Sequence, residues 1–176
     1  MSSYKLKVLL TGTPADSREE LMKNVIKNRF AANYKLTVGV DILTKDVEFR
    51  TGEIATLSIW DIGGQQRFEF IRSTFYKGAS GVILVFDLTR EQTYIRVKEW
   101  LTEIKHFVGP NIPFVLIGNK VRLSDKIKVA IDRNKVSEFV LAAGGIYIEV
   151  SPNMVSYINK ALRDLTKRII DSRNPN

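Results

Sequence analysis

The sequence contains no cysteine and only one histidine, His106. The missing cysteine excludes disulfides, thiolate metal sites and a cysteine nucleophile, and also a prenyl or palmitoyl group on this chain. His106 has no neighbouring ligand residues, so no metal site is predicted around it. No apolar run approaches the ~18 residues of a membrane helix, and the first residues lack a signal-peptide pattern. These absences predict a cytoplasmic protein without a stable membrane anchor.

Positive charge is in excess, because the sequence has 27 lysines and arginines but only 19 acidic residues, which gives a formal net charge of +8. The basic residues are scattered between apolar positions, as on the solvated faces of helices, and no block of five like charges occurs. Aromatic sheet motifs and paired cysteines and histidines, which mark many nucleic-acid-binding domains, are missing. We therefore expect no nucleic-acid partner, and leave weak attraction to anionic membrane surfaces open.

Strand-like and helix-like segments alternate along the 176 residues. The predicted strands span 5–11, 41–50, 54–60, 81–86, 113–118 and 146–150, and the predicted helices span 17–29, 93–108, 132–143 and 156–170. Such alternation requires a mainly parallel sheet with helices on both faces. A chain of this length fits one core, since domains usually split beyond ~250 residues. We predict one α/β domain over residues 1–176, a three-layer sandwich with a six-stranded, mostly parallel sheet and one antiparallel edge strand.

Local signals set several of these boundaries. Ser17 with Glu20 forms a capping box that predicts where the first helix begins. Gly144 and Gly145 end the helix over 132–143. A helical stripe of five residues predicts the buried face of the segment 93–108. The stripe consists of Val97, Trp100, Leu101, Ile104 and Phe107.

Residues Ser58–Thr89 read SIWDIGGQQRFEFIRSTFYKGASGVILVFDLT and contain a W-D-x-x-G-Q motif from Trp60 to Gln65. Upstream, the residues from Thr37 to Asp41 read TVGVD. In order, spacing and strand–loop context, the chain resembles the Rab-type small GTPases of the Ras superfamily along its whole length. The resemblance implies a P-loop GTPase fold, with GTP or GDP and Mg²⁺ as ligands.

The resemblance also implies roles for individual residues. Thr37 and Asp61 would hold Mg²⁺, Gly64 would donate its amide to the γ-phosphate, and Gln65 would orient the attacking water. Alternatively, Asp61 and Gly64 are merely turn residues at the end of a strand. The residues that match nucleotide-binding positions are Gly12, Ser17, Arg18, Glu19, Gly64, Asn119, Lys120 and Ser151.

The phosphate loop departs from the family pattern. Where G-x-x-x-x-G-K-[S/T] is expected, the chain has GTPADSRE from position 12 to 19. Ser17 replaces the second glycine, Arg18 the lysine and Glu19 the Mg²⁺-binding hydroxyl. As an N-cap, Ser17 would fold its hydroxyl onto the amides that should cradle phosphate. Together with Asp16 and Glu20, Glu19 puts carboxylates where triphosphate would lie, and like charges ~4 Å apart repel by about 4 kcal/mol at an effective dielectric near 20.

The guanine-reading motif is altered as well. Asn119-Lys120 is followed two residues later by Arg122, where the family has an aspartate that accepts two hydrogen bonds from guanine. Arginine has no acceptor, so both guanine donors would stay unpaired. Pro152 after Ser151 removes the backbone N–H that this motif would offer to the guanine oxygen. Both halves of the nucleotide site therefore differ from those of a working GTPase.

Three functions fit this sequence. The first is a pseudoGTPase, with weak or absent GTP binding, that acts as a protein-interaction module in trafficking or signalling. Its partner would be an effector or regulator bound through the switch surface at Ile42, Trp60 and Phe75, with Tyr76 adjacent. Alternatively, Trp60 and Phe75 are core residues. The second is a nucleotide-switching GTPase that hydrolyses GTP with a rearranged loop, and the third is a domain for another anion or nucleotide.

Overall fold

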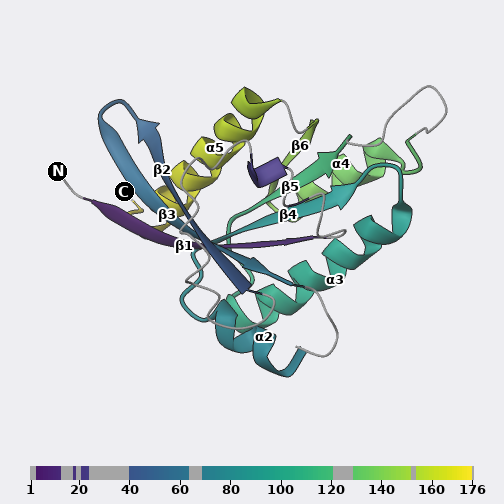
Figure 1. Cartoon of the computed structure of the whole chain (residues 1–176), viewed down its shortest axis with the longest axis horizontal. Coiled ribbons are helices and arrows are strands. Elements are labelled where there is room, and N and C mark those ends of the chain that lie inside the picture. Colours follow the sequence, from purple (N-terminus) through teal and green to yellow (C-terminus); the bar gives the residue numbers. More distant parts are fainter. Residues whose placement is uncertain are drawn as a thin grey trace.

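A computed structural model shows a six-stranded sheet with helices on both faces (Figure 1). It describes residues 3–12, 18, 21–23, 40–63, 69–120, 129–151 and 154–175. The strands are β1 (Tyr4–Gly12), β2 (Val40–Arg50), β3 (Glu53–Ile62), β4 (Gly81–Asp87), β5 (Phe114–Asn119) and β6 (Ile146–Val150). Their order in the sheet is β2-β3-β1-β4-β5-β6.

The predicted sheet is confirmed. β1 pairs in parallel with β3 and β4, and the parallel ladder continues from β4 through β5 to β6. β2 pairs with β3 antiparallel and forms one edge. Every residue of β4 and β5 is buried, as continuous apolar runs in a two-sided sheet predict.

Two apolar clusters cover the two faces of the sheet. The helices are α2 (Glu69–Tyr76), α3 (Glu91–Val108), α4 (Arg133–Ala142) and α5 (Val155–Arg173), and residues 18 and 21–23 are also helical. One cluster joins α5 and Leu21 and Met22 to the sheet, and the other joins α3 and α4 to its opposite face. Figure 1 shows α5 on one side of the sheet and α2 and α3 on the other.

Local sequence signals account for several helix ends. The side chain of Asp132 accepts the backbone N–H groups of Asn134 and Lys135 and so caps the start of α4. Gly144 has a φ of +76°, which permits the chain to turn after this helix as predicted. The capping box predicted at Ser17 and Glu20 lies outside the described residues.

Two features differ from the sequence prediction. Phe107, expected in the buried stripe of α3, is 56% exposed, because it lies in the last turn of the helix; its ring neighbours among the described residues are Tyr76 and His106. Helix α2 was not predicted; it spans only eight residues, and Arg72 is buried in it while Ile71 is 36% exposed. None of the helices in the described part of the chain combines the length and apolar character needed to cross a bilayer.

Candidate functional site

The carboxyl ends of β1 and β3 meet where the resemblance places the phosphate site. Gly12 ends β1 and is paired with Val85 of β4. Its φ is +150°, and a Cβ there would lie 2.1 Å from the Val85 carbonyl oxygen. Strand packing therefore requires glycine at this position without any reference to phosphate. The match of Gly12 to the family pattern is explained by packing alone.

Arg18 fills this end of the sheet. Its side chain is buried, with the residue 5% exposed, and its Nε donates to Asp61 Oδ1 at 2.9 Å. The Nη1 group donates to the carbonyl oxygen of Gly12. Asp61 itself lies opposite Asp41 of β2 in the antiparallel ladder. The guanidinium thus links the end of β1 to the end of β3.

These contacts do not fit a Mg²⁺–nucleotide site. The resemblance assigns Mg²⁺ coordination to Asp61, but the Oδ1 of Asp61 accepts a hydrogen bond from a cation of the same chain. Two cations cannot share that position without strong repulsion. No cluster of three acidic, histidine or cysteine residues suited to a metal exists among the residues that the structure describes. The second implied ligand, Thr37, lies outside those residues.

At the guanine end of the predicted site, Lys120 forms an ion pair within the protein. Asn119 is buried at the end of β5, and the backbone N–H of Lys120 donates to Val150. The Lys120 ammonium lies 3.6 Å from a Glu149 carboxylate oxygen. Burial alone would raise the pKa of Glu149, but hydrogen bonds from Arg133 and Tyr147 outweigh it and hold the pKa below its usual value. The Lys120 side chain is therefore directed to Glu149.

Ser151 follows β6, as predicted. Its backbone N–H points to the sulfur of Met154 at 3.3 Å, and its carbonyl accepts the Met154 N–H at 2.9 Å. The structure thus places Gly12, Arg18 and Asp61 together, and Asn119, Lys120 and Ser151 at the neighbouring strand ends. The remaining predicted residues lie outside the described part of the chain. They are Ser17, Glu19, Thr37, Gly64 and Gln65.

Three residues from β2, β3 and α2 form a half-buried apolar patch. Ile42 and Trp60 are cross-strand neighbours, and the Trp60 ring lies 6.2 Å from the ring of Phe75 in α2. All three side chains remain partly exposed. The three predicted partner-binding residues are therefore brought together, and we call them the Ile42–Trp60–Phe75 patch.

Comparison with known proteins agrees with this architecture. The model of the Ras family matches residues 7–171. The chain belongs to the Ras family. The Ras-related protein RABG3f of Arabidopsis thaliana is 33% identical over 172 residues, which cover 95% of this chain and 83% of that relative. The small-GTPase fold inferred from the sequence motifs is thereby confirmed.

In this Ras-family protein, the patch has a cationic neighbour that the sequence reasoning missed. The Nζ of Lys7, on β1, lies 3.9 Å from the centroid of the Trp60 ring and donates to the carbonyl of Lys77 at 2.8 Å. Burial lowers the pKa of Lys7. The available signal was a lysine inside the apolar run of β1, two positions before Leu9, the strand partner of Trp60.

Beneath the patch, α2 is fastened to α3 by a polar cluster. Arg72 is 5% exposed, and its Nη2 donates to both oxygens of Glu103 at 3.1 and 3.3 Å. The Tyr76 hydroxyl donates to Glu103 at 2.9 Å. Tyr76 is thus a core residue and not part of the exposed patch. Arg72 Nε and Nη1 and the Trp100 indole N–H are buried without a hydrogen-bond partner within the described part of the chain.

Proposed function

We propose that this protein is a Rab-like pseudoGTPase, a small-GTPase fold that binds protein partners without control by GTP. The observation that carries the proposal is the Arg18 guanidinium, which donates to Asp61 and Gly12 at the position of Mg²⁺ and phosphate. A cation of the chain itself thus neutralises Asp61. Nucleotide would have to displace a buried, hydrogen-bonded charge, and removing one partner of such a pair costs about 3–5 kcal/mol.

The first test is calorimetric titration of purified, nucleotide-stripped protein with GTP and GDP in the presence of Mg²⁺. We expect no binding heat and no change of the melting temperature with either nucleotide. The matched control restores the family residues by Ser17→Gly, Arg18→Lys, Glu19→Thr and Arg122→Asp, and this variant should bind. Micromolar or tighter GTP binding by the natural protein would contradict the proposal.

Such binding would instead favour a GTPase with a rearranged loop. The observation that favours this alternative is that Asn119 and Lys120 match the family pattern at the end of β5. The resemblance assigns this end of the strand to binding of the guanine base. Replacing Gln65 with leucine would then decide the enzymatic question. Loss of GTP hydrolysis in this variant, with binding retained, would assign the water-orienting role to Gln65.

The partner surface of the proposed pseudoGTPase is the Ile42–Trp60–Phe75 patch. Aromatic side chains that are partly buried and held in place are common anchors of protein interfaces. A family-like partner would be an effector, an exchange factor or a related GTPase. Such a partner needs an apolar centre for the two rings, and an acceptor near the Lys7 ammonium would complement the charge.

We expect Trp60→Ala to reduce capture of a bound partner by about tenfold or more, as for an interface anchor. Proximity labelling in cells, followed by binding assays with each purified candidate, measures the loss. Ile54→Ala is the matched control, because Ile54 is an exposed apolar residue near the other end of the same strand. Equal capture by both variants would remove the patch from the proposed interface.

A further inference from the structure

A cavity of about 310 Å³ lies between the end of α2 and the last turn of α3, and we call it the α2–α3 cavity. Tyr76 and Ala79 line it on one side, and Phe107 and Val108 line it on the other. Phe107 is 56% exposed, and its ring lies 6.1 Å from the Tyr76 ring. The walls are thus largely apolar, and the volume is at the lower end of the range of about 300–1,000 Å³ for ligand sites. The cavity is suited to one apolar side chain.

Three basic side chains gather at the turn 77–80, which borders this cavity. Lys77 lines the cavity itself and is exposed. The Nζ of Lys7 donates to the carbonyl oxygen of Lys77 at 2.8 Å, and the Nη2 of Arg173 donates to the Ser80 hydroxyl. One strand, one turn and the end of α5 therefore bring positive charge to the same place.

Among the residues that the structure describes, none of these three basic side chains has a carboxylate partner. Acids on the adjoining helices are engaged elsewhere. Glu103 of α3 accepts hydrogen bonds from Arg72 and from the Tyr76 hydroxyl. Asp171 of α5 pairs with Arg50. Positive charge at the turn is therefore not balanced within the described part of the protein, and an acidic group from outside would be attracted to it.

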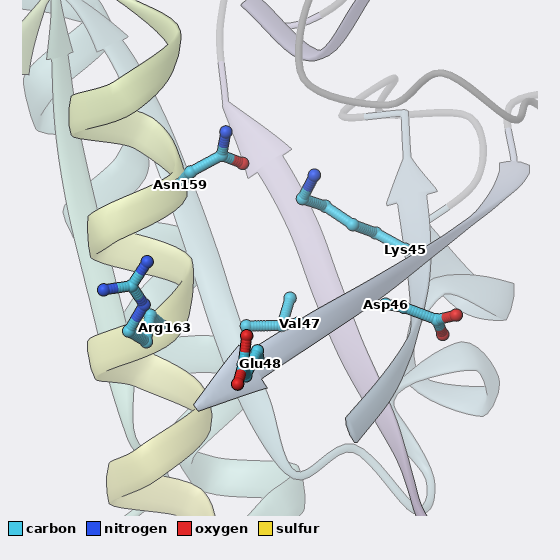
Figure 2. A pocket seen from close by; sticks show the side chains of 6 residues that line it. All are labelled: Lys45, Asp46, Val47, Glu48, Asn159 and Arg163. Carbon is cyan, nitrogen blue, oxygen red and sulfur yellow. The ribbon is translucent and has the colours of Figure 1, made fainter. Parts of the chain in front are cut away.

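A second cleft, of about 220 Å³ between β2 and α5, differs in its charges (Figure 2). Its two basic residues, Lys45 and Arg163, line it together with two acids, Asp46 and Glu48. This cleft offers a ligand no excess of either charge. Unbalanced positive charge beside an apolar cavity therefore distinguishes the end of α2.

Lys7 connects the α2–α3 cavity to the Ile42–Trp60–Phe75 patch. Its ammonium lies 3.9 Å from the centroid of the Trp60 ring, and the same group donates to Lys77, which lines the cavity. Phe75 of the patch and Tyr76 of the cavity are consecutive residues of α2. A partner bound to the patch can therefore reach the cavity along the end of α2.

We propose that the α2–α3 cavity receives an apolar side chain from an acidic segment of the protein partner, whose carboxylates pair with Lys77, Arg173 and Lys7. The proposal rests on the protein-binding part of the proposed function, and it states the chemistry of the partner. Hydrogen bonds between carboxylates and ammonium or guanidinium groups are stronger than those between neutral groups. A flat anionic membrane would meet the same charges but would leave the cavity unfilled, so a protein segment is favoured.

The test uses the full chain labelled with ¹⁵N. It is titrated with an acetylated hexapeptide of one phenylalanine, three glutamates and two glycines. This peptide should shift the backbone amides of Ala79, Phe107 and Val108 saturably. It should bind about tenfold more tightly than a peptide with glutamine for every glutamate, or one with alanine for phenylalanine.

Variants of the protein locate the binding. Lys77→Met and Arg173→Met should each weaken binding of the glutamate peptide about threefold, as exposed ion pairs do. Lys135→Met, a matched loss of an exposed charge on α4, should leave the affinity unchanged. Phe107→Ala keeps all charges and should remove the preference for phenylalanine over alanine in the peptide.

The proposal is overturned by the absence of saturable shifts, by equal affinity for the glutamate and glutamine peptides, or by an equal effect of Lys77→Met and Lys135→Met. A second arm sediments the protein with phosphatidylserine vesicles. Sedimentation that depends on Lys77, without peptide binding, would assign the surface to a membrane and overturn the proposal as well. GTP binding by the natural protein would contradict the pseudoGTPase proposal alone, because the peptide titration needs no nucleotide.

Discussion

Asp61→Leu lowers the free energy of unfolding by about 3–5 kcal/mol, measured by urea denaturation of the nucleotide-free protein. The reason is that Arg18 stays buried and charged after losing the carboxylate that its Nε contacts at 2.9 Å. A working GTPase would use Asp61 toward Mg²⁺, and the same substitution would then act mainly on nucleotide affinity. The size of the stability loss without nucleotide therefore reports on the internal ion pair.

The double variant Arg18→Met/Asp61→Leu completes the cycle. Replacing both members of a buried ion pair by apolar residues is often close to neutral, so this variant should unfold within about 2 kcal/mol of the natural protein. Asp46→Leu is the control, because Asp46 is an exposed acid on β2 with one hydroxyl partner, and it should cost about 1 kcal/mol or less. A double variant as unstable as Asp61→Leu would show that lost packing, and not the unpaired charge, causes the effect.

Glu103→Leu should also destabilise the protein by about 3–5 kcal/mol. Glu103 accepts hydrogen bonds from Arg72 and from the Tyr76 hydroxyl, and both donors are buried between α2 and α3. Without it, the Arg72 guanidinium keeps no carboxylate within the described part of the chain. Burial and the bond to Glu103 raise the pKa of Tyr76, so spectrophotometric titration should show this pKa falling toward its usual value in the variant.

Glu99→Leu, one helical turn earlier on α3, is the matched control. Glu99 is 57% exposed in its pair with Arg96, and exposed pairs contribute about 0.5 kcal/mol or less. An equal loss of stability in Glu103→Leu and Glu99→Leu would mean that the Arg72 guanidinium becomes solvated once its partner is removed. The polar cluster would then not stabilise the packing of α2 on α3. Arg72→Met/Glu103→Leu should recover most of the lost stability, for the same reason as above.

The sheet was predictable because its signals are local. Continuous apolar runs mark β4 and β5, and the hairpin of β2 and β3 follows from alternation around Gly52. α2 was not predictable in this way, because Arg72 and Tyr76 bury polar atoms on Glu103 while Ile71 faces outward. Periodicity identifies apolar faces, and α2 offers it only eight residues, with Arg72 among the buried ones.

The candidate site was predictable in its positions but not in its contacts. The motif order located Gly12, Arg18 and Asp61, and the loss of the phosphate-loop lysine was plain from the sequence. The pairing of Arg18 with Asp61 was not, since the two are 43 residues apart and meet only through the β1–β3 pairing. For the same reason Lys7 over Trp60 required the strand register.

The Arg18–Asp61 pair has a consequence for how such a protein would carry information. A molecular switch needs two states of similar free energy that a ligand can exchange. A cation that is part of the chain cannot be released by hydrolysis, so under the proposed function only one state is available. The amount of partner engaged would then follow the abundance and location of the protein itself. Its activity would then be regulated by synthesis, degradation and recruitment. It could change no faster than these processes do.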